Sequence, residues 1–356
     1  AYIDLDLRDL PLSFRLGKQQ VVWGETDSFR MLDRANPLDL TWHQVYESWD
    51  DLRVPLWLIK GLWEIGYVGP LSDAFLEFYW NPGDWIPAKQ GFMPGYPWGI
   101  PQTTPLELLG DLFGIRKLYK RTRLFRRGDY QRNPADNSQV GVRVSAVTPQ
   151  GLQFTLNYFY QRWAGDDGTN YAPIRAVQDI SDVQAALARG EGPAEFIAPY
   201  VHTIGLSLNF SEDDYTQTVY RLETVYDFGV PFSDRAKKSP IPVLQDVIYG
   251  VSKRDMWKGM IGFDRPTWIP ALNRTSTFFF TGQFFWHYLI DRETTFVGNL
   301  DPDAPSADKI RHWETVITLL VNTFYAGGAV VPTVTYALDP VNSFNLYVGW
   351  TLDYYI

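Results

Sequence analysis

The sequence predicts an all-β protein, specifically a transmembrane antiparallel β-barrel of about fourteen strands. Three observations lead to this fold class. Segments in which apolar and polar residues alternate recur about a dozen times along the chain. The 356 residues are 16% aromatic, yet they contain no uncharged apolar run of about 18 residues, which a membrane-spanning helix would need. The segments that link the predicted strands are alternately short and long, as in outer-membrane barrels.

The clearest strand segment is 275–290, TSTFFFTGQFFWHYLI. Its even-numbered residues are mostly large and apolar, whereas its odd-numbered residues include Gln283 and His287. Because side chains alternate between the two faces of a strand, we expect one face to meet lipid and the other a watery interior. The same alternation occurs at 3–7, 12–17, 152–161, 203–210, 217–228, 312–325 and 343–354.

The whole chain, 1–356, is predicted to form one barrel domain, in which short and long links alternate between the strands. Short links are expected at 10–11, 68–72, 148–151, 211–214 and 326–327. Long links are expected at 23–51, 81–139, 164–199, 229–255 and 291–308. This division gives thirteen strands, and single-chain bacterial barrels usually close with an even number. A fourteenth strand and a signal peptide are therefore expected to precede Ala1 in the natural protein.

Composition and motifs argue against several classes of function. The net charge of −9 disfavours nucleic acid as a partner, because phosphate binding normally needs a basic surplus. The absence of cysteine excludes disulfides and thiolate metal sites. The four histidines are scattered, and no nucleophile, phosphate-binding or metal-protease motif is present. We expect no enzyme activity, no metal and no cofactor. A large soluble β-sandwich or propeller is the alternative fold.

The predicted inner face carries charges of both signs, which would set a transverse field across a watery lumen. The candidate lumen-lining residues are Arg15, Lys18, Arg143, Arg221, Glu223, Asp227, Lys258, Gln283, His287 and Glu314.

The long link 81–139 is the candidate plug or extracellular cap. Its first half is too apolar to be exposed to water and could fold into the lumen. Its candidate plug residues are Trp85, Phe92, Met93, Tyr96 and Trp98. A helix is expected at 104–118, and short helices at 23–51 and 178–189. A basic run follows in this link, at Arg116, Lys117, Lys120, Arg121, Arg123, Arg126 and Arg127. These side chains could bind lipopolysaccharide phosphates, line an entrance for anions, or simply be solvated.

Two stretches, GKQQVVWGETDSFRMLDRANPLDL at 17–40 and MIGFDRPTWIPALNRTSTFFFTGQFF at 260–285, resemble the bacterial outer-membrane proteins catalogued as domain of unknown function 1302. The resemblance spans the whole chain. It implies an outer-membrane barrel that is often encoded near a resistance-nodulation-division transporter of the inner membrane and a lipoprotein-like periplasmic partner, and hence a role in the traffic of hydrophobic molecules across the envelope. The family supplies no catalytic residues.

The function predicted from these observations is a bacterial outer-membrane channel or transporter for hydrophobic or amphipathic solutes, in contact with membrane lipid and lipopolysaccharide. A general or anion-selective porin is the first alternative. A non-conducting structural or docking barrel in an envelope assembly is the second.

Overall fold

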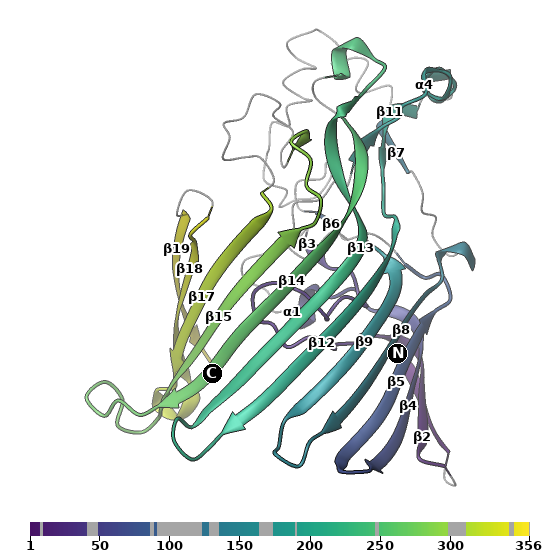
Figure 1. The fold of residues 1–356 in the computed structure, drawn as a ribbon. Coiled ribbons are helices and arrows are strands. Elements are labelled where there is room, and N and C mark those ends of the chain that lie inside the picture. Colours follow the sequence, from purple (N-terminus) through teal and green to yellow (C-terminus); the bar gives the residue numbers. More distant parts are fainter. Residues whose placement is uncertain are drawn as a thin grey trace.

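The structure is a computed structural model. It describes residues 1–7, 10–40, 49–85, 89–90, 123–127, 135–163, 174–188, 191–245, 249–297, 311–341 and 345–355. Most of them belong to one antiparallel sheet of fourteen strands, whose curved shape is seen in Figure 1. All-β architecture is therefore confirmed.

Thirteen strands follow one another across the sheet, each paired with the next one in this order. They are β1 (Tyr2–Leu7), β2 (Leu12–Gln19), β4 (Leu56–Val68), β5 (Leu71–Asn81), β8 (Gln139–Val147), β9 (Gln153–Arg162), β12 (Tyr200–Glu212), β13 (Thr218–Lys238), β14 (Tyr249–Thr267), β15 (Phe278–Leu289), β17 (Trp313–Thr323), β18 (Val330–Asp339) and β19 (Asn345–Tyr354). The short β16 (Phe296–Val297) pairs with β13. Strands β1 and β19 are the two edges, and within the described residues no pairing joins them.

The two faces of the sheet differ as the alternation predicts. On β12, the inner-face residues Thr203 and Ser207 are 0% and 2% exposed, whereas Ile204 between them is 52% exposed. The outer face carries exposed aromatic and aliphatic side chains on nearly every strand. Examples are Trp57, Trp63, Trp80, Leu156, Phe228, Ile261, Phe284, Trp313, Val348 and Trp350. Such a continuous apolar surface needs an apolar neighbour.

Glycines make room for aromatic rings on neighbouring strands. Gly141 of β8 lies opposite Tyr79 of β5, and a Cβ atom at Gly141 would stand 2.2 Å from the Tyr79 ring. Gly259 of β14 lies opposite Trp286 of β15 in the same way, with 2.0 Å between the ideal Cβ and the indole. Each ring therefore covers the glycine backbone of the neighbouring strand. This contact stabilises the pairing of the two strands at a position where the glycine contributes no side chain.

Two predicted links differ from the structure, and one expected helix is present. Much of 229–255 is strand rather than loop, because β13 and β14 continue as a ribbon beyond the rest of the sheet, with register shifts after Asp227 and Asp234. Only 239–248 connects them, with the short 3-10 helix Pro242–Leu244. The helix expected at 178–189 is present as α4 (Ile180–Ala188). The expected helices at 23–51 are wrong for 23–40, which is almost entirely irregular, while residues 49–51 belong to α1 (Trp49–Leu52) and residues 41–48 lie outside the described part of the chain.

Two small sheets accompany the large one. Strand β11 (Glu191–Phe196) pairs with β10 (Ile174–Ala176) and with β7 (Arg123–Arg127), and these strands lie near the tip of the β13–β14 ribbon (Figure 1). Strand β3 (Asp39–Leu40) pairs with β6 (Lys89–Gln90). None of the helices in the described residues combines enough length and apolar character to span a bilayer.

Candidate functional site

The inner face of the sheet is covered by residues 20–40, which we call the inner segment. It follows β2 and crosses the concave side of the curved sheet (Figure 1). Val21, Trp23, Met31 and Leu32 are each at most 3% exposed. They form one buried cluster with side chains of the sheet, namely Leu56, Leu58, Tyr79, Phe159, Val225, Met260 and Phe285.

The inner segment folds back on itself and is closed by a buried asparagine. The Asn36 side chain accepts a hydrogen bond from the Val21 backbone at 2.7 Å and donates to the carbonyl oxygens of Gln19 and Val54. Gly24 lies so close to Asp33 that a Cβ atom at Gly24 would stand 2.6 Å from the Asp33 nitrogen. These contacts fix the path of the segment without any regular secondary structure.

Aromatic rings hold the inner segment against strands in both halves of the sheet. The Trp23 indole lies 5.3 Å from the Tyr79 ring of β5 and 5.2 Å from the Phe159 ring of β9. On the other side, the Phe29 ring meets the Phe285 ring of β15 edge to face at 5.0 Å. Tilted and edge-to-face geometries are the favourable ones for aromatic pairs. The segment therefore bridges strands that lie far apart in the sheet.

A buried cluster of three charges holds the middle of the inner segment. Arg34 Nη1 lies 2.6 Å from Asp227 Oδ1, and Lys258 Nζ lies 2.8 Å from Asp227 Oδ2. The Thr203 hydroxyl also donates to Asp227, and the cations of Arg34 and Lys258 both lie over the Trp163 ring. Asp227 is 0% exposed and Lys258 is 1% exposed. Burial of this cluster is tolerated because every charge in it has a counter-charge within hydrogen-bond distance.

A second polar group holds the tip of the inner segment. Arg221 binds Asp264 of the neighbouring strand through Nε at 2.7 Å, and its Nη2 lies 2.8 Å from the Asp27 carboxylate. Gln283 donates to the same Asp27 carboxylate at 2.8 Å and accepts from the Asp27 backbone at 3.3 Å. Glu223 accepts the backbone N–H groups of Glu25 and Leu32.

The remaining predicted lumen residues lie beside this site, with one exception. Arg143 lies 2.6 Å from Glu77, which also binds Lys60, and Arg15 pairs with Asp4. His287 stands next to Lys258 and Glu314 in the register of β14, β15 and β17.

Lys18 is the exception, and its assignment to the lumen is wrong. It is opposite the outward Trp57, whereas Gly17 and Gln19 are buried on the inner face. Arg15 and Lys18 are three residues apart, so in a regular strand they point to opposite faces.

Ion pairing reduces the number of free charges that could set the transverse field predicted for the interior. The charges of Arg143, Arg221, Asp227 and Lys258 are held in ion pairs across neighbouring strands or with the inner segment. Among the described residues, no group of three or more acidic or histidine side chains is arranged to hold a metal ion.

Most of the predicted plug and basic residues lie outside the described residues. These are Phe92, Met93, Tyr96, Trp98, Arg116, Lys117, Lys120 and Arg121. Trp85 is described, is 2% exposed and belongs to the cluster around the inner segment. The backbone of Arg123, Arg126 and Arg127 forms β7.

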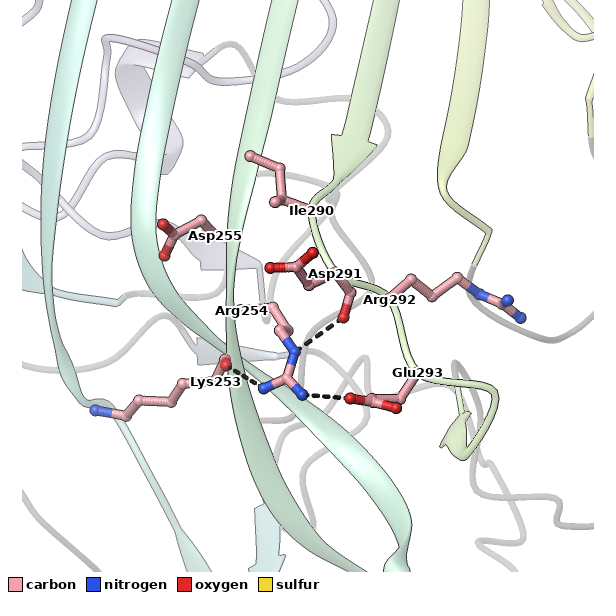
Figure 2. Close-up of a pocket in the computed structure, with 7 residues that line it drawn as sticks. All are labelled: Lys253, Arg254, Asp255, Ile290, Asp291, Arg292 and Glu293. Atoms are coloured by element: carbon pink, nitrogen blue, oxygen red, sulfur yellow. Dashed lines mark hydrogen bonds and ion pairs between the residues drawn. The ribbon is translucent and has the colours of Figure 1, made fainter.

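A separate hollow of about 680 Å³ lies between residues 253–255 of β14 and residues 290–293, which follow β15 (Figure 2). Its centre is occupied by Arg254, which donates to the Asp291 carbonyl oxygen at 2.9 Å and to the Glu293 carboxylate at 2.7 Å. Arg254 thereby fixes the link after β15 to β14. The hollow therefore contains the hydrogen bonds that hold residues 291–293 against β14.

The geometry defines an all-β protein with one large curved antiparallel sheet, an apolar outer face, and an inner face of mixed polar and apolar side chains that a segment of the same chain covers. The chain belongs to the family described as protein of unknown function, DUF1302, whose family model matches residues 1–354. Neither the comparison with curated proteins nor the comparison with solved structures gives a match.

Proposed function

We propose that the sheet closes into a β-barrel that spans the bacterial outer membrane. The support is the contrast between its faces. A soluble protein would have to leave an unusually large apolar surface in water, while a barrel turns that surface to lipid and its polar face inward. The alternately short and long links, and the family resemblance, favour the same placement.

We further propose that the barrel passes hydrophobic or amphipathic solutes and that the inner segment is its plug. One observation carries this: the interior holds a buried apolar cluster, in which Trp23, Tyr79 and Phe159 meet. A general porin keeps a water-filled lumen with charged walls. An interior that binds aromatic rings is suited to solutes with apolar bodies. A resistance-nodulation-division transporter and a lipoprotein-like periplasmic protein are the proposed partners, on the basis of the resemblance alone.

A non-conducting docking barrel is the second candidate. It is favoured by the ion pairs that hold the inner segment in place, because a structural barrel has no need to release its plug. An anion-selective porin would require the basic run 116–127 to face an open lumen.

Two measurements test the proposal, one on the purified wild-type protein and one on cells that lack it. In planar bilayers we expect no steady current, because the inner segment covers the interior. In cells, removing the gene is expected to slow the uptake or the export of a fluorescent apolar dye, with no change for a small hydrophilic dye. Steady open steps with anion preference would support the porin, and silence with unchanged dye traffic would support the docking barrel.

A further inference from the structure

The inner segment occupies a patch of the sheet that has the features of a ligand site. We define the wall patch as Tyr79, Phe159, Glu223, Met260 and Phe285, which come from β5, β9, β13, β14 and β15. Each of these side chains is at most 1% exposed. Four of them are apolar or aromatic, and Glu223 is the only charged member of the patch.

Glu223 is the carboxylate on this wall that lacks a cation. Its two oxygens accept the backbone N–H groups of Glu25 and Leu32 from the inner segment, and within the described part of the chain it takes part in no ion pair. The nearest cations along the strands are already engaged, since Arg221 binds Asp264 and Lys258 binds Asp227. If the inner segment left, Glu223 would lose both backbone donors and would face the interior with no cation paired to it among the described residues.

The inner segment itself shows what fits the wall patch. It places N–H donors on Glu223 and the Trp23 ring against Tyr79 and Phe159. Trp23 and Glu25 are two residues apart, so their Cα atoms lie at most about 7 Å apart, and the Trp23 side chain adds to the distance between the ring and the donor. A small molecule with a donor and a ring at that separation would satisfy the same groups.

We propose that the wall patch binds a ring-bearing apolar amine, whose ammonium group pairs with Glu223 while its ring lies between Tyr79 and Phe159, in place of the inner segment. The ammonium supplies the missing counter-charge as well as the hydrogen bonds. A carboxylate would add a second negative charge beside Glu223, and an alcohol would supply only a neutral donor. This inference rests on the proposed function, in which solutes cross the interior of the barrel, and it names their class.

Binding of three matched probes to the full chain in lipid nanodiscs tests the inference. The probes are 3-(1-naphthyl)propylamine, 3-(1-naphthyl)propan-1-ol and 3-(1-naphthyl)propanoic acid, and isothermal titration calorimetry is corrected with empty nanodiscs. We expect the amine to bind at least about tenfold more tightly than the other two, because hydrogen bonds to a charged group are the stronger ones. Glu223→Gln is expected to remove this preference. Glu64→Gln, which removes an exposed carboxylate elsewhere on the sheet, is the control and should keep it. Equal binding of the amine and the acid to the wild-type protein would overturn the proposal.

A second measurement avoids any change to Glu223. Cysteines at Asp27 and Gln283, whose side chains are hydrogen-bonded, are joined by a reducible bifunctional maleimide to hold the inner segment in place. Amine binding should be lost in the linked protein and return after reduction, whereas unchanged binding in the linked protein would contradict the proposal. Because both assays measure binding, failure here together with normal dye traffic would reject the amine site and leave the proposed transport function standing. Amine binding without dye traffic would support the amine site and reject the proposed transport function.

Discussion

Replacing residues 23–33 with a glycine-serine linker of equal length is expected to convert a silent protein into one that shows steady open steps in planar bilayers. The replacement removes Trp23, Asp27, Phe29 and Leu32, and with them the contacts to Phe159, Arg221 and Phe285. It retains Arg34 and Asn36, so the buried charges around Asp227 keep their partners. The flexible linker has no apolar side chains with which to cover the wall, and water and ions can then enter.

The control for this experiment is the same linker inserted after Gly151, in the turn between β8 and β9, where the residue side chains are exposed. That variant should remain silent. If the replaced segment conducts no more than the control, the inner segment is not what closes the interior.

Asp227→Asn is expected to lower the free energy of unfolding by about 3–5 kcal/mol. The substitution keeps the shape of the side chain but removes the negative charge that Arg34 and Lys258, two buried cations, both contact. Urea unfolding in detergent micelles, followed by tryptophan fluorescence, measures the loss. Trp163 should report on it directly, because both cations lie over its ring.

Asp4→Asn provides the comparison for the Asp227 variant. The ion pair between Asp4 and Arg15 has a similar length, 2.7 Å, but the two side chains are 48% and 39% exposed. An exposed pair contributes at most about 1 kcal/mol. If the two variants lost the same stability, the cluster around Asp227 would not be an important support of the fold.

The large sheet could be predicted from the sequence because its signal is local. In β15, the alternation of Phe284, Trp286 and Tyr288 with Gln283 and His287 states which face each side chain occupies, and the structure confirms it for Gln283, which is 3% exposed beside the inner segment. Lys18 shows how the same rule fails when residues are assigned by charge. Lys18 is three residues from Arg15, so the alternation of side chains places the two residues on opposite faces of the strand. Position along the strand, and not charge, therefore gives the correct face for Lys18.

The inner segment could not be predicted, because nothing local marks it. Its apolar residues at 21, 23, 29, 31 and 32 follow neither the period of a strand nor that of a helix. Its partners are distant in the chain: Glu25 and Glu223 are 198 residues apart, and Gln283 and Asp27 are 256 apart. The plug is expected at 81–139 because that link is long and its first half apolar, yet Trp85, the one candidate plug residue in the described part of the chain, belongs to the buried cluster of the shorter inner segment.

The two stretches that carry the family resemblance meet in the structure. The first, 17–40, contains the inner segment. The second, 260–285, supplies Met260, Asp264, Gln283 and Phe285 to the wall that the segment covers. The two stretches that carry the resemblance therefore coincide with the candidate site.

The central claim is that the outer face of the sheet lies in lipid and the inner face encloses the plugged interior. Because the chain has no cysteine, a bimane label can be placed singly along β12, at positions 204, 206 and 208 of the outer face and at 207 and 209 of the inner face. In vesicles with a spin-labelled lipid, the account predicts strong quenching at the three even positions and weak quenching at the two odd ones. Equal quenching at all five, or quenching of the even positions by aqueous iodide instead of the spin-labelled lipid, would contradict it.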